Sequence, residues 1–306
     1  MATGFATVGE NHYGKSRVRV VRVFKRPDRH DIVEFNVNIQ LYGDFETSYT
    51  EGSNEKVVAT DSMKNMVYVI AKRDDVEQPE KFCLAYADHI LKHYSHVSKV
   101  DVSIIQTLWQ RIKVDGKDHH HAFSRGGSAE KRTASVVMNR NGPTELKGGI
   151  MDLIVLKTTQ SGFEGFVRDK YTTLPEVKDR IFATSMTATW TFANLPRGTI
   201  CFKSSYEKSR QALVETFAGP AGSGIYSPSV QLSMYQMGSA VLEKVPTIDS
   251  ISIYLPNLHC NLINMAPFGL SNPQEIFVPT EEPHGAINAT IVRKGLSATM
   301  SLRSRL

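Results

Sequence analysis

The segment from Asp31 to Tyr42 constrains the fold most, because its side chains alternate between apolar and polar. Five apolar residues share one parity: Val33, Phe35, Val37, Ile39 and Leu41. This period of two is typical of a β-strand with one face in a core. Residues 17–23 are rich in valine, and Pro27-Asp28-Arg29-His30 predicts a turn, so the two segments should form a hairpin. The valines change parity at Val21, which predicts a β-bulge there.

Two amphipathic helices are expected after this hairpin. The first has apolar residues at i, i+3, i+4 and i+7, namely Met63, Met66, Val67 and Ile70. Thr60 or Asp61 is its expected N-cap. The second helix begins near Pro79, since proline is favoured in a first helical turn. Residues 100–114 then return to the alternation typical of strands.

The second half of the chain repeats this order of elements. Strands are expected at 149–157, 183–192, 251–255 and 275–292, and helices at 204–217 and 228–244. Strands interrupted by helix pairs indicate an α+β fold with antiparallel sheets. We therefore expect two tandem domains, residues 1–141 and 142–303, divided near Asn141-Gly142-Pro143.

Composition excludes several classes of protein. Hydrophobic residues make up 41% and charged residues 22%, as in ordinary globular chains. No apolar run reaches the roughly 20 residues that span a bilayer, so no membrane partner is expected. The three cysteines, Cys83, Cys201 and Cys260, cannot form a closed disulfide framework, which fits a reducing compartment. The net charge of +5 is spread along the chain, which favours a solvated surface over a nucleic-acid interface.

The sequence lacks the common catalytic motifs. The chain has neither a phosphate-binding GxxxxGK[ST] loop nor a GxSxG nucleophile elbow. His119-His120-His121 suggests a metal, but adjacent side chains on a strand point to opposite faces. No second cluster lies at ligand spacing, so no metal site is expected.

Several motifs together resemble the urate oxidase (uricase) family. In chain order they are Tyr13-Gly14-Lys15, residues 57–65, His121-Ala122-Phe123, residues 156–163, residues 168–174, Asp179-Arg180, residues 226–231 and residues 255–259. Eight motifs in the same order are far more specific than any one alone. The resemblance runs from near residue 12 to the C-terminus.

The resemblance implies both architecture and activity. Family members have two tandem T-fold domains per chain and assemble into homotetramers with a tunnel-like barrel. Their active sites are shared between subunits. They oxidise urate with O₂ and water to 5-hydroxyisourate and H₂O₂ in purine catabolism, with neither metal nor organic cofactor.

Residues for holding urate can be assigned by this resemblance. Arg180 matches the urate-binding arginine, and its planar fork suits a bidentate grip on an anionic purine. Gln231 offers an amide donor and acceptor in a first helical turn, and Val230 matches a position that contributes a backbone group. Phe163, flanked by glycine, has room to stack on the ring. Asp61 is also expected at the substrate.

Residues for the chemistry follow from the same comparison. Lys15, Thr60 and His259 resemble the proton relay of the family, and the Thr60 backbone also contacts urate. Asn257 matches the residue that holds O₂ or water above the purine, and Thr60 is expected to help position it. Because Asn257 and His259 are two apart on an extended segment, their side chains share one face. Without the resemblance, a surface arginine at 180 and a structural histidine at 259 are the simpler interpretations.

Three alternatives stay open from the sequence. One is a different T-fold enzyme acting on a pterin or another purine-like ring, although the metal-binding histidine set usual in such relatives is absent from the sequence. Another is a non-catalytic purine-binding T-fold protein. The third is a nucleic-acid-binding module, which rests only on the +5 charge.

The C-terminal Ser304-Arg305-Leu306 is a close variant of the S-K-L peroxisomal address. It predicts a peroxisomal location and binding to the import receptor, which suits an enzyme that releases H₂O₂.

A fluorescent reporter carrying about ten C-terminal residues should give puncta that overlap a peroxisome marker. The same reporter without Leu306 should stay diffuse. Diffuse signal from both reporters would contradict the prediction.

Overall fold

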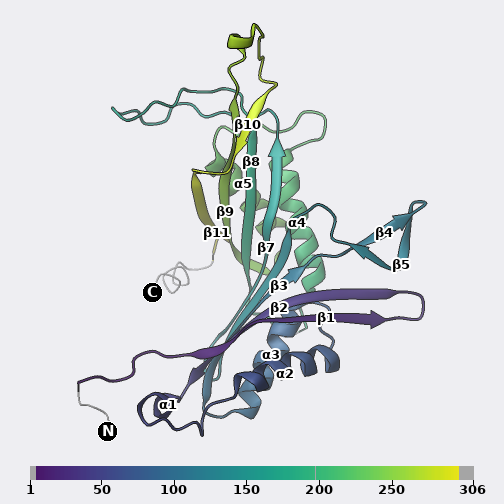
Figure 1. The fold of residues 1–306 in the computed structure, drawn as a ribbon, viewed down its shortest axis with the longest axis vertical. Helices are drawn as coiled ribbons and strands as arrows, with labels where there is room; N and C mark the ends of the chain where they lie inside the picture. Colours follow the sequence, from purple (N-terminus) through teal and green to yellow (C-terminus); the bar gives the residue numbers. More distant parts are fainter. Residues whose placement is uncertain (1–4, 197, 296–306) are drawn as a thin grey trace. The chain divides into compact units, whose positions relative to one another are not determined.

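A computed structural model describes residues 5–196 and 198–295 (Figure 1). The chain divides into two compact units. The first is Met1–Gly149 with Asn194–Lys203, and the second is Ile150–Ala193 with Ser204–Leu306. Strand β7, which follows the Asn141-Gly142-Pro143 turn, crosses this division. The expected targeting tripeptide, 304–306, lies outside the described residues. Within those residues, no helix is long and apolar enough to cross a membrane.

The first unit contains an antiparallel sheet in the order β1-β2-β3-β6. Its strands are β1 (Tyr13–Lys25), β2 (His30–Gly43), β3 (Val97–Thr107) and β6 (Lys131–Asn139). A separate hairpin joins β4 (Gln110–Val114) and β5 (Lys117–Ser124), so the strand expected over 100–114 is broken after Thr107. The helices are α1 (Glu46–Thr50), α2 (Thr60–Arg73) and α3 (Pro79–His93).

The core of this unit lies between the sheet and helices α2 and α3. The five alternating residues of β2 are all buried, as predicted. The helices contribute the buried residues Met63, Val67, Ile70, Phe82 and Tyr86. Removing each such side chain from water stabilises the fold by about 1.5–3 kcal/mol. The strict alternation of β2 therefore fixes which face of the sheet the helices cover.

The predicted bulge at Val21 is wrong. The register of β1 against β2 shifts between Lys15 and Val18, where Arg17 has a φ of 60°. Beyond Val18 the strand pairs regularly, and Val21 is 55% exposed. Val21 and Val23 thus lie on the solvent face, and the change of parity among the valines is not a change of register.

Arg22 explains why the valine pattern misled. It takes a half-buried position on the helix side of β1, where a hydrophobic residue was expected. Its guanidinium donates hydrogen bonds to the carbonyls of Ala71 and Asp74 at the C-terminal end of α2. Such carbonyls have no partner within the helix and favour a cation.

The predicted N-caps also need correction. Helix α2 begins at Thr60 with Ala59 as N-cap, and no side chain caps it. Thr60 and Asp61 therefore lie in the first turn. Helix α5 (Val230–Lys244) begins later than the expected residue 228. Its N-cap is Ser229, whose hydroxyl accepts a hydrogen bond from the Leu232 N–H at 3.1 Å.

The second unit has the same plan. Its strands are β7 (Thr144–Lys157), β8 (Phe182–Phe192), β9 (Ile248–Leu262), β10 (Phe277–Thr280) and β11 (Ala286–Val292). Strands β8, β10 and β11 all pair antiparallel with β9. A short 3₁₀ turn, Ala266–Phe268, follows β9. Two α-helices, α4 (Phe202–Ala218) and α5, accompany the sheet. The predicted α+β fold is confirmed.

Side chains fix both helices on this sheet. Phe217 of α4 meets Phe182 of β8 with ring centroids 5.1 Å apart. Helix α5 lies on β9 and β11, and Gly238 allows close approach, because a Cβ there would lie 2.8 Å from the Ile291 side chain. Helix α5 is thereby held closely against the sheet.

A buried ion pair in the first unit gives a stability prediction. Arg132 of β6 donates to both carboxylate oxygens of Glu80, at 3.0 and 2.8 Å, and to Gln78 at 2.8 Å. Arg132→Met should cost about 3–5 kcal/mol in the free energy of unfolding, because it leaves the Glu80 carboxylate buried and unpaired. Arg132→Met/Glu80→Leu should recover at least half of that loss in urea titrations. Additive losses in the double variant would contradict the coupling.

Candidate active site

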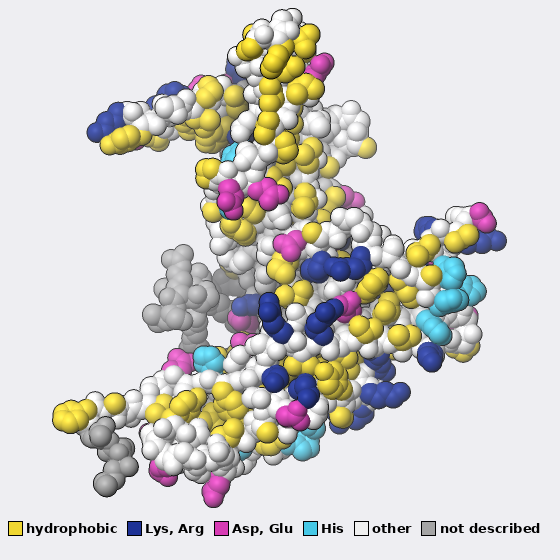
Figure 2. All heavy atoms as spheres, in the orientation of Figure 1, with side chains coloured by type: hydrophobic (Ala, Val, Ile, Leu, Met, Phe, Trp, Pro, Cys, Tyr) yellow, Lys and Arg dark blue, Asp and Glu magenta, His cyan; other side chains and the backbone are white. Residues whose placement is uncertain are grey.

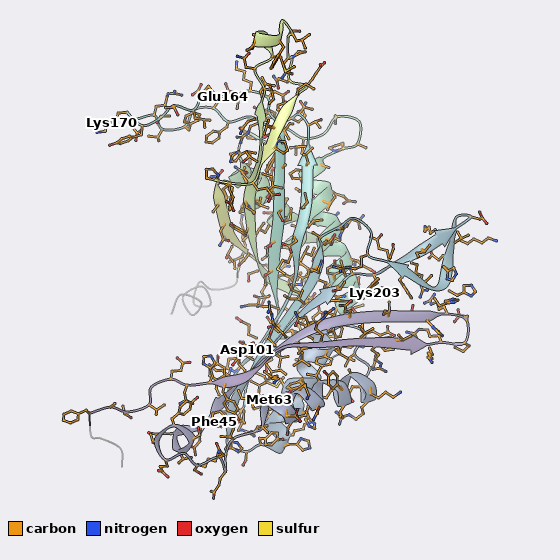
Figure 3. All side chains as sticks on the ribbon, viewed as in Figure 1. Phe45, Met63, Asp101, Glu164, Lys170 and Lys203 are labelled. Carbon is orange, nitrogen blue, oxygen red and sulfur yellow. The ribbon has the colours of Figure 1, made fainter. Side chains whose placement is uncertain are left out.

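An extended arm, residues 163–177, projects from the second unit. Its base is closed by two backbone hydrogen bonds, from Phe163 N to Val177 O at 2.7 Å and from Val177 N to Phe163 O at 3.1 Å. Glu164 lies near the base and Lys170 at the far end (Figure 3). The Phe163 ring stacks on Phe166 with centroids 4.8 Å apart. The base of the arm thus presents a half-buried aromatic surface.

Arg180 follows the arm and returns to its base. Its backbone N–H donates to the Ser161 carbonyl at 2.8 Å, and its guanidinium carbon lies 5.3 Å from the Phe163 ring centroid. None of the ion pairs among the described residues uses Arg180. Burial lowers the pKa of Arg180, and the nearby Tyr226 opposes this. An arginine remains charged at neutral pH even so, so the site holds a half-buried cation.

Asp179 does not pair with this arginine. Its carboxylate accepts hydrogen bonds from the Thr159 hydroxyl at 2.9 and 3.0 Å and from the Gln160 N–H at 3.1 Å. The simple surface salt bridge that the Asp179-Arg180 pair suggests is therefore absent from the described contacts of both residues. The guanidinium is left available for another anion.

The start of α5 lies beside the same segment. Ser161 and Ser227 form a parallel β-bridge, supported by hydrogen bonds from Gly162 N to Ser227 O at 3.0 Å and from Ser227 N to Gln160 O at 2.8 Å. Val230 and Gln231 are the first two residues of the helix, so their N–H groups have no acceptor within it. A helix N-terminus of this kind attracts an anion.

Asn257 and His259 lie on the neighbouring strand β9. Asn257 is opposite Thr184 of β8, and Thr184 donates to the Pro256 carbonyl at 2.8 Å. Two strands pair in turn with the other edge of β9. Strand β11 pairs with it up to Pro256, and β10 pairs with it from His259. The expected common face of Asn257 and His259 follows from their positions in one strand. The second unit thus brings Phe163, Arg180 and the start of α5 together, with Asn257 on the strand next to β8.

The first unit groups the other expected residues. The Tyr13 hydroxyl bonds to both the carbonyl and the N–H of Val58, at 3.2 and 2.6 Å, which ties β1 to the segment before α2. The hydrogen bond from Lys64 lowers the pKa of Asp61, and the charge of Lys15 lowers it further. Lys15 is therefore near enough to Asp61 for its charge to act on that carboxylate, and Thr60 precedes Asp61 in the chain.

Gly14 allows this arrangement. A Cβ at Gly14 would lie 1.8 Å from the Ile39 carbonyl oxygen, so only glycine permits the close strand pairing beside Lys15. Lys15 is half-buried and sits where the register shifts. The bulge thus begins at the lysine that the family resemblance identifies as a base.

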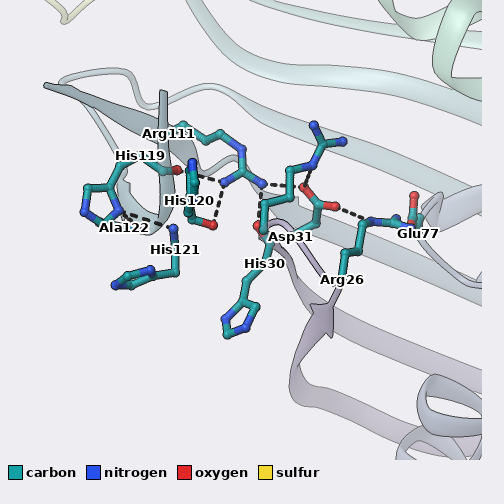
Figure 4. A network of polar contacts seen from close by, with 10 residues as sticks. Arg26, His30, Asp31, Glu77, Arg111, His119, His120, His121 and Ala122 are labelled. Carbon is teal, nitrogen blue, oxygen red and sulfur yellow. Dashed lines mark hydrogen bonds and ion pairs between the residues drawn. The ribbon is translucent and has the colours of Figure 1, made fainter. Parts of the chain in front are cut away.

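The histidine run belongs to a separate network on the β4–β5 hairpin (Figure 4). His119 Nδ1 accepts from the N–H groups of His121 and Ala122, at 3.2 and 3.1 Å. Arg111 donates to the carbonyls of His119 and His120 and also pairs with Asp31. Within the described part of the chain, no three His, Cys, Asp or Glu side chains are grouped to hold a metal. This network anchors the hairpin to the β1–β2 turn.

In the second unit, a half-buried cation, an aromatic ring and a helix N-terminus thus lie together, a combination that suits a flat anion. The profile of the uricase family matches residues 11–137 and 146–288. The uricase-2 isozyme 1 of Glycine max is 41% identical over 294 residues, covering 93% of this chain and 94% of its own. The uricase of Dictyostelium discoideum is 40% identical over 291 residues, covering 94% and 98%. The chain belongs to the uricase family.

A solved structure agrees. The uricase from Arthrobacter globiformis is 41% identical, covers 98% of this chain and 99% of its own, and superposes with a TM-score of 0.89. The resemblance expected from eight short motifs is confirmed, and so is the tandem architecture.

Three residues of this region were not singled out from the sequence. Tyr226 donates to the Lys178 carbonyl at 3.1 Å and so braces the segment before Arg180. Lys157 and Ser227 bond to each other beneath the start of α5 at 2.7 Å. All three lie within or beside the matched motifs, but their types alone are ordinary for loops and strand ends.

Gly162 provides a test of this packing. A Cβ there would lie 2.0 Å from the Tyr226 hydroxyl oxygen and 3.0 Å from the Val177 carbonyl. Gly162→Ala should lower the free energy of unfolding by about 1–3 kcal/mol through overpacking. Removing the clashing hydroxyl in Gly162→Ala/Tyr226→Phe should recover part of the loss. Gly127→Ala, which has open space, is the matched control in urea titrations. Equal effects at both glycines would contradict the close packing.

Proposed function

We propose that the chain is a urate oxidase, which converts urate, O₂ and water to 5-hydroxyisourate and H₂O₂. The observation that carries this proposal is the half-buried Arg180 guanidinium with no carboxylate partner in the described contacts. It lies over the Phe163 ring and beside the start of α5. This combination of cation, aromatic face and helix N-terminus suits a planar anion. Membership of the uricase family supports urate as that anion.

Binding would use groups of the second unit. Arg180 would grip the purine rim with two parallel donors, and the Gln231 amide would pair with an adjacent N–H and C=O. The Val230 N–H would donate to an oxygen of the anion. Phe163 would stack on one ring face, which leaves the other face for the oxidant.

The chemistry would use groups of both units. Lys15, with Thr60 and His259, would remove a proton from urate and pass it to the reduced oxygen. Deprotonated urate is electron-rich enough to reduce O₂ itself, so the enzyme acts by positioning and by stabilising charge. Asn257 would hold O₂ above the ring. Urate supplies two electrons and O₂ accepts them; the peroxide then leaves as H₂O₂ and water supplies the added hydroxyl.

A homotetramer would complete the sites. We propose that Lys15, Thr60 and Asp61 of one chain face Arg180 and Gln231 of a neighbouring chain, as the resemblance implies. Strand β1 ends the order of the sheet, and Val21 and Val23 are exposed on it. An unpaired strand edge beside exposed apolar side chains favours association.

The arm of the second unit supports the same assembly. Val167, Tyr171 and Leu174 are exposed at 93%, 76% and 52%. Figure 2 shows yellow side chains along this arm and dark blue ones at its end. Exposed apolar groups on a projecting segment are typical of a contact surface.

The alternatives fare less well. A T-fold enzyme for pterins would usually present a metal-binding histidine set, and the described histidines form no such group. A non-catalytic purine-binding protein would not need Lys15 and His259 together with the anchor. The peroxisomal address at 304–306 stays a prediction.

Kinetics of two variants test the proposal. The purified protein should consume urate, followed by its absorbance, and release equimolar H₂O₂. Arg180→Lys should mainly raise KM, because losing a two-donor contact costs about 2–5 kcal/mol in a desolvated site. Lys15→Met should mainly lower kcat, because a base acts on the transition state.

The control is Lys72→Met, a change at an exposed lysine in the last turn of α2, which should behave as the wild type. Absence of H₂O₂ would refute the function. The same kinetic pattern in both variants would refute the division of roles.

A further inference from the structure

Lys157, the last residue of β7, is held in an unusual environment. Its ammonium donates to the Ile225 carbonyl at 2.8 Å and to the Ser227 hydroxyl at 2.7 Å. It also lies 5.8 Å from the Phe182 ring centroid and 5.4 Å from that of Phe217. None of the described ion pairs includes it. Its charge is therefore stabilised by neutral groups alone.

The groups that Lys157 binds lead directly into the anion-binding elements. Ser227 is 3% exposed and also accepts a hydrogen bond from the Ser233 hydroxyl at 2.7 Å. The backbone of Ser227 pairs with Gln160 and Gly162, which precede Phe163. Three residues after Ser227, α5 begins at Val230. One ammonium thus fixes the junction from which both Phe163 and the α5 N-terminus extend.

The positive charge of Lys157 also affects the anion-binding elements. Burial lowers the pKa of Lys157, so keeping the proton has a cost in the folded chain. A lysine whose only purpose was to fill space here could be replaced by an apolar residue at no such cost. A cation beneath a helix start adds to the positive end of the helix dipole and favours an anion bound there.

We propose that Lys157 is a positioning residue for the substrate anion, acting through Ser227 to set the first turn of α5 and the Phe163 segment, and supplying unpaired positive charge beneath them. It does not touch urate. This inference rests on the proposed function, since it names urate as the anion.

The test measures binding and turnover separately. The Kd of urate is measured by calorimetry without O₂, so that no turnover occurs, and KM and kcat are measured in air. Lys157→Met should raise Kd and KM by about tenfold to a hundredfold and change kcat by less than about twofold. The reason is that the variant loses the positive charge and the hydrogen bonds to Ile225 and Ser227 that hold the anion-binding elements. Lys157→Arg keeps the charge and both donors, so it should stay within about threefold of the wild type.

A coupled variant tests the route through Ser227. As a single variant, Ser227→Ala should weaken urate binding. In the Lys157→Met background it should weaken binding little further, because the contact between Lys157 and Ser227 is already lost. Lys72→Met serves as the matched control at an exposed lysine. Thermal midpoints of all variants are recorded alongside.

The outcomes separate the two proposals. A wild type that binds urate without oxidising it refutes the proposed function, and the Kd series still tests Lys157. An unchanged Kd in Lys157→Met overturns the inference. A fall of kcat and thermal midpoint in both Lys157 variants also overturns it, because that pattern indicates a purely structural role. A selective rise of Kd and KM in Lys157→Met that Lys157→Arg reverses supports it.

Discussion

The backbone pairing between residues 160–162 and Ser227 is the contact on which the candidate site depends. Three hydrogen bonds converge there: Ser227 N to Gln160 O, Gly162 N to Ser227 O and Arg180 N to Ser161 O. They join the end of the β7 segment, the return of the arm and the approach to α5. These three segments are far apart in the sequence, so no single helix or strand could hold Phe163, Arg180 and the start of α5 together. Catalysis by positioning requires such a junction, since small displacements of reacting groups are costly.

Much of the fold could be predicted from the sequence, because its strongest signals are periodic. The alternation of β2 and the spacing of Met63, Val67 and Ile70 are direct records of burial, and both are confirmed. The incorrect predictions of the fold concern polar residues whose contacts or positions their residue type does not reveal. Arg22 takes an inward position because its guanidinium finds the helix carbonyls, and no rule on valine parity includes that contact. Thr60 looked like an N-cap by residue type, yet the helix starts at Thr60 itself.

The site could be predicted only in part, and for a different reason. Arg180, Gln231 and Asn257 are common residue types in loops and strands, so only the ordered set of motifs identified them. The supporting residues carried no such signal. Tyr226 donates to the Lys178 carbonyl, and Lys157 donates to the Ile225 carbonyl as well as to the Ser227 hydroxyl. Every residue has a carbonyl, so residue type does not reveal such a contact. Support of this kind depends on where the backbone passes, which sequence periodicity does not specify.

The change of neighbours along β9 has a consequence for Asn257. The backbone of this residue is fixed on both edges, by its pairing with Thr184 and by the hydrogen bond from its N–H to the Gly285 carbonyl at 3.0 Å. On the Gly285 edge, however, the neighbour has no side chain, and a Cβ there would already lie 3.5 Å from the Asn257 amide nitrogen. The backbone of Asn257 is thus held on both sides, while its side-chain amide can rotate about its terminal bond. In the proposed reaction, this one position would then present either a donor or an acceptor, first to O₂ and afterwards to water, without any movement of the sheet.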